Sequence, residues 1–224
     1  MNINDIPIEN LLETCYEIYE VDGPIAVIFA RQRELIEKYL PIEEEILRRP
    51  LPELPFDLHD AVCQEALKAR AWWFVEEMGE AFDALNEQSL SKFREELSDA
   101  LHFLTELLIL SGFEWEEINT ELVPKDWIGK TAPVVGFYRS NVLLKVRALA
   151  VIGELAMAMW HLRNKPWKRT QVLTDVDHYH QRLRVTYSGF LNLLMAHCDL
   201  TLEDVAILYL RKSEVNKFRM RSNY

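Results

Sequence analysis

The sequence predicts an all-α protein, built as an antiparallel multi-helix bundle. Only seven glycines occur in 224 residues, and the nine prolines leave two long proline-free segments, 56–123 and 167–224. Apolar residues recur at the i, i+3, i+4 spacing of a helix face, whereas alternating β-branched strands and Asn-Gly hairpin turns are missing. Helices can therefore run long, and short connections make neighbouring helices antiparallel.

The order of the elements follows from the breaks between apolar patterns. The segments RRPLPELPFD and LVPKDWIGKTAP are expected to be loops, RNKPWKRT a basic connection and NEQS a tight turn. The last helix opens with Thr201 and Asp204 at the spacing of a capping box. The expected helices span residues 8–19, 24–40, 57–85, 90–110, 135–163, 175–197 and 202–220.

Length, charge and cysteine content exclude several classes of protein. A chain of this length can bury a sizeable core, and we expect one domain over residues 1–224. A net charge of −11 disfavours nucleic acid as a partner, and no apolar run reaches the roughly 18 residues of a membrane helix. The three cysteines, Cys15, Cys63 and Cys198, are odd in number, lie far apart and form no CxxC motif, so a disulfide framework or a zinc site is not expected. We therefore expect a soluble, cytoplasmic protein that binds neither nucleic acid nor membranes.

Two acidic pairs flank the NEQS turn, Glu77 with Glu80 and Glu96 with Asp99. Residues three apart share a helix face, and in a hairpin centred on Gln88 the two pairs stand at the same height, roughly 12 Å from the turn. Each pair continues an apolar stripe, so the four carboxylates are expected to converge on a partly buried face. Such a cluster needs a cation, and Mg²⁺ accepts carboxylates while sharing its coordination with substrate phosphates.

The alternative is a solvent-exposed acidic patch. The same ExxE spacing occurs at Glu34 with Glu37 and at Glu114 with Glu117, so a single pair carries little information. The two pairs at matched height are what favour a metal site over this alternative.

The C-terminal helix carries a basic face. Tyr209, Lys212, Asn216 and Arg219 fall at i, i+3, i+7 and i+10, and five basic residues from position 211 onward face one acid, Glu214. Taken alone, this pattern is typical of a basic C-terminus that complements the helix dipole. Together with an acidic hairpin, it predicts a site that binds phosphate groups.

These motifs resemble a known family. The order ExxE, fifteen residues, then ExxD followed by ALHF is similar to the all-α nucleoside triphosphate (NTP) pyrophosphatases. The closing KSEVNKFR resembles the KNxxNxFR signature of the dimeric dUTPase branch, and RQREL resembles the QQKL segment of that branch. Besides the four carboxylates, the resemblance implies functional positions at Gln32, His102, Phe103, Lys212, Asn216, Arg219 and Tyr224.

The resemblance implies a homodimer with the all-α NTP pyrophosphatase fold that converts a deoxynucleoside triphosphate to monophosphate and pyrophosphate. Glu77, Glu80, Glu96 and Asp99 would hold Mg²⁺ and form the catalytic group. Water would be the nucleophile, with one carboxylate, such as Glu77, accepting its proton.

The same resemblance assigns the remaining positions to the nucleotide. Lys212 and Arg219 would neutralise phosphate charge, and Asn216 would position the nucleotide. Gln32 would contact the base or the substrate, and His102 and Phe103 would line the part of the site that holds the base or sugar. From the sequence alone, Phe103 is better explained as a core residue and His102 as the partner of a neighbour.

The substrate base and two other functions stay open. The dUTP-specific pattern has Asn where this chain has Ile36, and it carries Trp soon after the first acidic pair, where NEQSLSKF has none. The expected substrate is dUTP, with dCTP or a broad MazG-like NTP pyrophosphatase activity as alternatives. Three DxxH pairs leave a di-iron carboxylate bundle open, and a non-catalytic helical interaction protein is the last alternative.

Overall fold

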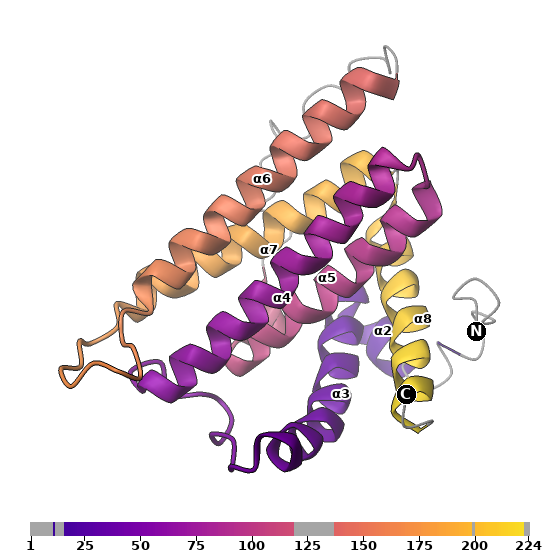
Figure 1. Cartoon of the computed structure of the whole chain (residues 1–224). Helices are drawn as coiled ribbons and strands as arrows, with labels where there is room; N and C mark the ends of the chain where they lie inside the picture. Colours follow the sequence, from indigo (N-terminus) through magenta and orange to yellow (C-terminus); the bar gives the residue numbers. More distant parts are fainter. Residues whose placement is uncertain (1–10, 12–15, 119–136, 199, 222–224) are drawn as a thin grey trace.

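The computed structural model describes residues 11, 16–118, 137–198 and 200–221 (Figure 1). All regular secondary structure among them is helical, which confirms the predicted all-α fold class. The elements are α2 (Tyr16–Asp22), α3 (Pro24–Leu47), α4 (Ala61–Asn86), α5 (Leu90–Leu110), the 3-10 helix η2 (Trp115–Glu117), α6 (Phe137–His161), α7 (Val176–Cys198) and α8 (Leu202–Arg221).

Two antiparallel hairpins form most of the bundle. Figure 1 shows α4 beside α5 and α6 beside α7, with α3 and α8 packed against α5. The hairpins meet in a common core, where the rings of Phe74 and Phe190 pack edge to face with centroids 5.2 Å apart. Burial of such apolar faces is the main force that holds helices together.

Local capping contacts set the starts of the helices, and α4 begins at Ala61 instead of the expected residue 57. Asp60 caps α4 by accepting hydrogen bonds from the backbone N–H groups of Val62 and Cys63 at 2.9 and 2.8 Å. Thr201 and Asp204 form the expected reciprocal capping contacts at the start of α8. The NEQS turn lies between α4 and α5 and places Gln88 in the left-handed region, with φ 59°.

The main difference from the prediction is the length of α3. Its expected end at Leu40 is wrong, because the helix continues through Pro41 to Leu47. Proline removes one backbone donor from a helix but does not force it to stop when later contacts hold the next turn. Glu43 supplies such a contact, since it forms an ion pair with Arg70 of α4. The expected starts of the first helix and of the helix at 135 lie outside the described residues.

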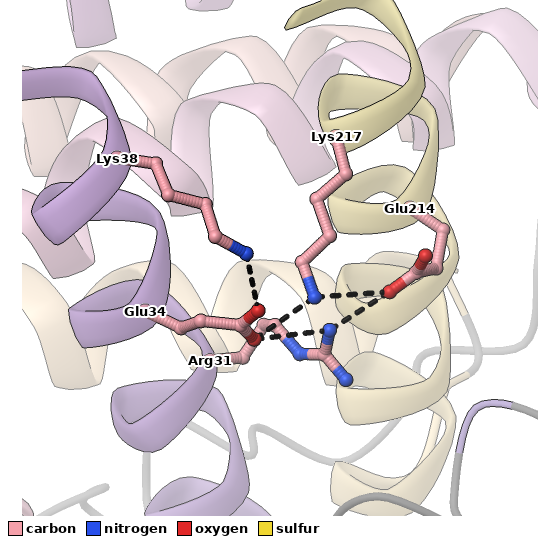
Figure 2. Close-up of polar contacts among 5 residues, drawn as sticks. All are labelled: Arg31, Glu34, Lys38, Glu214 and Lys217. Carbon is pink, nitrogen blue, oxygen red and sulfur yellow. Dashed lines mark hydrogen bonds and ion pairs between the residues drawn. The ribbon is translucent and has the colours of Figure 1, made fainter. Parts of the chain in front are cut away.

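An ion-pair network ties α3 to α8 (Figure 2). Lys217 lies 2.9 Å from Glu34 and 3.2 Å from Glu214, and Arg31 lies 2.8 Å from the same Glu214 oxygen. Lys38 adds a contact of 2.6 Å to Glu34. The network fixes the position of α8, which carries the basic face that the sequence singles out.

A helix that spans a bilayer must be both long and apolar. Within the described part of the chain, none is both long and apolar enough to span a membrane.

Candidate active site

The structure brings together three of the four predicted carboxylates. Glu77 of α4 and Glu96 and Asp99 of α5 each offer an oxygen within 4.8 Å of the others. Glu96 is buried, and the other two are half-buried. Glu80 is exposed and lies outside this group, although its charge still raises the pKa of Glu77 and Glu96.

The cluster holds more negative charge than its surroundings stabilise. Burial, and then the charge of Asp99 and the other nearby carboxylates, raises the pKa of Glu77 to about 8. Burial and neighbouring carboxylates also raise the pKa of Glu96, and burial raises that of Asp99. A cation among the three would relieve this repulsion. Three carboxylate oxygens at this spacing are a donor set that fits a hard divalent ion.

Lys212 of α8 supplies part of the missing positive charge. Its ammonium group lies 2.7 Å from Asp99 Oδ2 and 2.9 Å from Glu95 Oε1, and the side chain is buried. Sequence reasoning placed Lys212 at a phosphate but missed Glu95, the first acid of the EELSD segment. Glu95 precedes Glu96 by one position and therefore stands off the face that Glu96 shares with Asp99, so only the tertiary structure shows that it pairs with Lys212.

A cavity of about 620 Å³ opens beside the cluster, between α3, α4, α5 and α8. It reaches two of the carboxylates, Glu77 and Asp99. Lys212, Glu80 and Glu96 do not line it, and Tyr224 lies outside the described residues. Its walls include five residues that the sequence assigns to the nucleotide: Gln32, His102, Phe103, Asn216 and Arg219.

One wall of the cavity is a hydrogen-bonded set around Gln32. Gln32 Oε1 accepts from the Tyr209 hydroxyl and lies 3.1 Å from His102 Nδ1, and the rings of His102 and Tyr209 stack with centroids 3.9 Å apart. Burial, and then the charge of Lys212, lowers the pKa of His102 to about 3, so this imidazole is neutral and donates through Nδ1. Gln32 is thereby oriented with its amide oxygen occupied, and its NH₂ group has no acceptor among the residues that the structure describes.

The far end of the cavity holds residues that the sequence analysis missed. Arg70, Trp73 and Glu106 line it, together with Glu43 and Tyr39. The helical repeat could have found two of them, because Arg70 precedes Glu77 and Glu106 follows Asp99 by seven residues, which is two turns. Glu43 could not have been found, since it lies beyond the expected end of its helix.

The structure changes the interpretation of two sequence features, Ile36 and the DxxH pairs. Ile36 is buried in the main hydrophobic core and does not line the cavity, so its identity has no direct effect on the base. The one group of three potential metal ligands among the described residues contains no histidine. His180 contacts the Ser111 carbonyl and His178 pairs with Asp175, so the DxxH pairs do not converge on a metal.

A family model described as dUTPase matches residues 68–224, well over half of the chain. No curated protein and no solved structure matches the chain significantly. The matched region contains the carboxylate cluster, Lys212 and the α8 side of the cavity, whereas α3 lies outside it. The chain therefore belongs to the all-α dUTPase family and is a nucleotide pyrophosphohydrolase.

Proposed function

We propose that this protein hydrolyses dUTP to dUMP and pyrophosphate in a Mg²⁺-dependent reaction. The observation that carries the proposal is the position of the carboxylate cluster at the side of a nucleotide-sized cavity, whose α8 wall presents Asn216 and Arg219. Acidic groups for a metal and basic groups for phosphates are thus adjacent, as phosphoryl-transfer sites require.

Glu77, Glu96 and Asp99 would hold the metal, and Glu80 would join them by rotation of its exposed side chain. Bound Mg²⁺ would neutralise charge on the phosphates and make an attacking water more acidic. One carboxylate of the cluster would accept the proton of that water, and we assign this role to Glu77, which lines the cavity.

The basic residues of α8 would bind the triphosphate. Arg219 lines the cavity and would pair with phosphate oxygens, while Asn216 beside it would donate to the sugar or phosphate. Lys212 pairs with Asp99, which lines the cavity. When a metal neutralises the charge of Asp99, the ammonium group of Lys212 would be free to bind the departing pyrophosphate.

The base would occupy the inner part of the cavity. Phe103 and Trp73, with ring centroids 5.5 Å apart, supply aromatic surface there, and the free NH₂ group of Gln32 would donate to a carbonyl oxygen of the base. Because Ile36 lies in the core, the departure at this position gives no reason to prefer dCTP. We therefore propose dUTP as the substrate, in keeping with the family.

We further propose a homodimer, a single domain over residues 1–224 and a cytoplasmic location. The support for the dimer is an apolar stripe on the outer face of α6, where Val146, Leu149 and Trp160 are 56, 57 and 63% exposed. Light scattering at micromolar concentration would measure the mass, and a monomer would contradict the dimer.

The test of the function is a comparison of kcat/KM for dUTP, dCTP, dATP, dGTP and dTTP in the presence of Mg²⁺. We expect pyrophosphate release, with dUTP the best substrate by at least about tenfold. Equal slow turnover of all five would favour a broad pyrophosphatase activity, and no turnover of any would refute the proposed reaction. Chelation of the metal should abolish the activity reversibly.

A further inference from the structure

The cavity continues beyond the residues that the proposed reaction uses. Along α4 it runs from Glu77 past Trp73 to Arg70, and along α5 from Asp99 to Glu106. Two helical turns span about 10 Å, which is comparable with the distance from the innermost phosphate of a nucleotide to the far edge of its base. The groups at this end are therefore placed to meet the Watson–Crick edge of the base.

Three charged side chains meet at this end. Arg70 donates through Nη1 and Nη2 to the two oxygens of Glu43, with 3.1 Å between Nη1 and Oε1, and through Nε to Glu106 Oε1 at 3.1 Å. Both oxygens of Glu43 are thus occupied. The one hydrogen bond of Glu106 among the residues that the structure describes goes to Oε1, so Oε2 has no donor there.

The charges in this group do not balance. Two carboxylates share one guanidinium, and the side chains of Arg70 and Glu106 are only 2 and 15% exposed. Burial of an uncompensated carboxylate is costly, and a brace between helices would need only one acid. Burial raises the pKa of Glu106, and the charge of Glu43 adds to the shift, although the charge and hydrogen bond of Arg70 oppose it.

We propose that Glu106 is a specificity-determining residue whose Oε2 accepts a hydrogen bond from an N–H group on the Watson–Crick edge of the substrate base. Arg70 is a positioning residue that holds Glu106, and Glu43 fixes Arg70. The donor is N3–H in uracil and the N4 amino group in cytosine. This inference rests on the proposed function, because it requires a nucleotide in the cavity.

The first experiment needs no mutation. We compare kcat/KM of the full-length protein for dUTP, dCTP and the 2-pyrimidinone deoxynucleoside triphosphate, whose base has neither N3–H nor an amino group and adds no bulk. We expect the better natural substrate to exceed the analogue by at least about tenfold, because an unpaired buried acceptor is costly. Preference for dUTP identifies N3–H as the donor, and preference for dCTP identifies the amino group.

The second experiment assigns this discrimination to one side chain. Glu106→Gln should reduce the ratio between the natural substrate and the analogue to within about threefold, because an amide accepts more weakly than a carboxylate. Glu43→Gln should lower thermal stability and reduce the ratio only in part, because Glu43 acts on Glu106 through Arg70. Glu45→Gln, exposed on the same helix, controls for the loss of a charge.

The outcomes separate the two proposals. An inactive wild-type protein would refute the reaction itself, whereas an active one that turns over the analogue as fast as dUTP and dCTP would overturn only the role of Glu106. A folded Glu106→Gln protein that keeps the full ratio would do the same. If that variant does not fold, Glu106→Asp replaces it and should also lower the ratio, because a shorter side chain draws the acceptor back from the base.

Discussion

The ammonium nitrogen of Lys212 lies 2.7 Å from Oδ2 of Asp99. This contact joins α8 to α5 and gives the acidic cluster an internal cation, while Glu95 holds the same nitrogen from the other side at 2.9 Å. The lysine that the sequence assigns to phosphate thus contacts the acidic cluster in this structure. Because one nitrogen holds both carboxylates, loss of Lys212 is expected to affect the fold as well as the reaction.

Lys212→Met should weaken both stability and activity. Removal of one partner of a buried ion pair costs about 2–3 kcal/mol, so Tm of the metal-free protein should fall by about 5–10 °C. kcat should fall about 100-fold or more through the loss of charge at the leaving group. Lys92→Met, on the exposed face of α5, is the control. A variant with wild-type kcat would show that Lys212 serves only the fold.

Glu77→Gln should abolish pyrophosphate release from dUTP, with a loss in kcat of about 100-fold or more. The substitution removes a metal ligand and the proposed proton acceptor but keeps the shape of the side chain. Glu76→Gln provides a matched control, because Glu76 is the adjacent residue and faces solvent beside Trp72. Survival of full turnover in the Glu77 variant would mean that the hydrolase mechanism is wrong.

Stability of the metal-free protein should decrease as pH rises from about 4.5 to about 8. The pKa of Glu77 in the folded protein is raised to about 8, so the folded state binds a proton that the unfolded state releases, and this contribution is lost as pH rises through 8. Mg²⁺ should displace the proton and stabilise most at high pH. Melting curves with EDTA and with Mg²⁺ test this, and a metal effect that does not grow with pH would contradict it.

The network in Figure 2 should contribute stability that acid removes. Burial alone would raise the pKa of Glu34, but hydrogen bonds from Lys38 and Lys217 lower it to about 2. The contribution is therefore present above about pH 4.5 and lost as pH falls towards 2. Glu34→Gln should lower Tm at pH 7 by a few degrees and less at pH 3, since the side chain is 40% exposed. Glu37→Gln, on the exposed face of α3, should leave Tm unchanged.

Tyr209→Phe should raise KM for dUTP by about threefold to tenfold with kcat changed by less than roughly twofold. The substitution removes the hydroxyl that orients Gln32 but keeps the ring that stacks on His102. Tyr187→Phe is the control, because its hydroxyl contacts Thr105 at 3.3 Å, away from the cavity. An equal effect of both substitutions would point to a general loss of stability instead.

Most of the fold could be predicted from the sequence, because helix periodicity, caps and turn residues act over a few positions. The α4–α5 hairpin, its centre at Gln88 and the shared face of Glu96 and Asp99 all follow from the helical repeat. Residues 41–47 of α3 could not be predicted in this way, because Pro41 favours a helix end whereas tertiary contacts extend the helix.

The sequence by itself determined which residue types stand on each helix face, and therefore that acidic and basic groups were available for a metal and a triphosphate. Only the tertiary structure decided which of them meet. Glu77 joins the acidic cluster, whereas Glu80 is exposed. Lys212 forms an ion pair with Asp99, and Arg70 forms one with Glu106. The physical reason is that these contacts depend on how far helices are rotated and crossed against one another, which the packing of their side chains sets and no local pattern encodes.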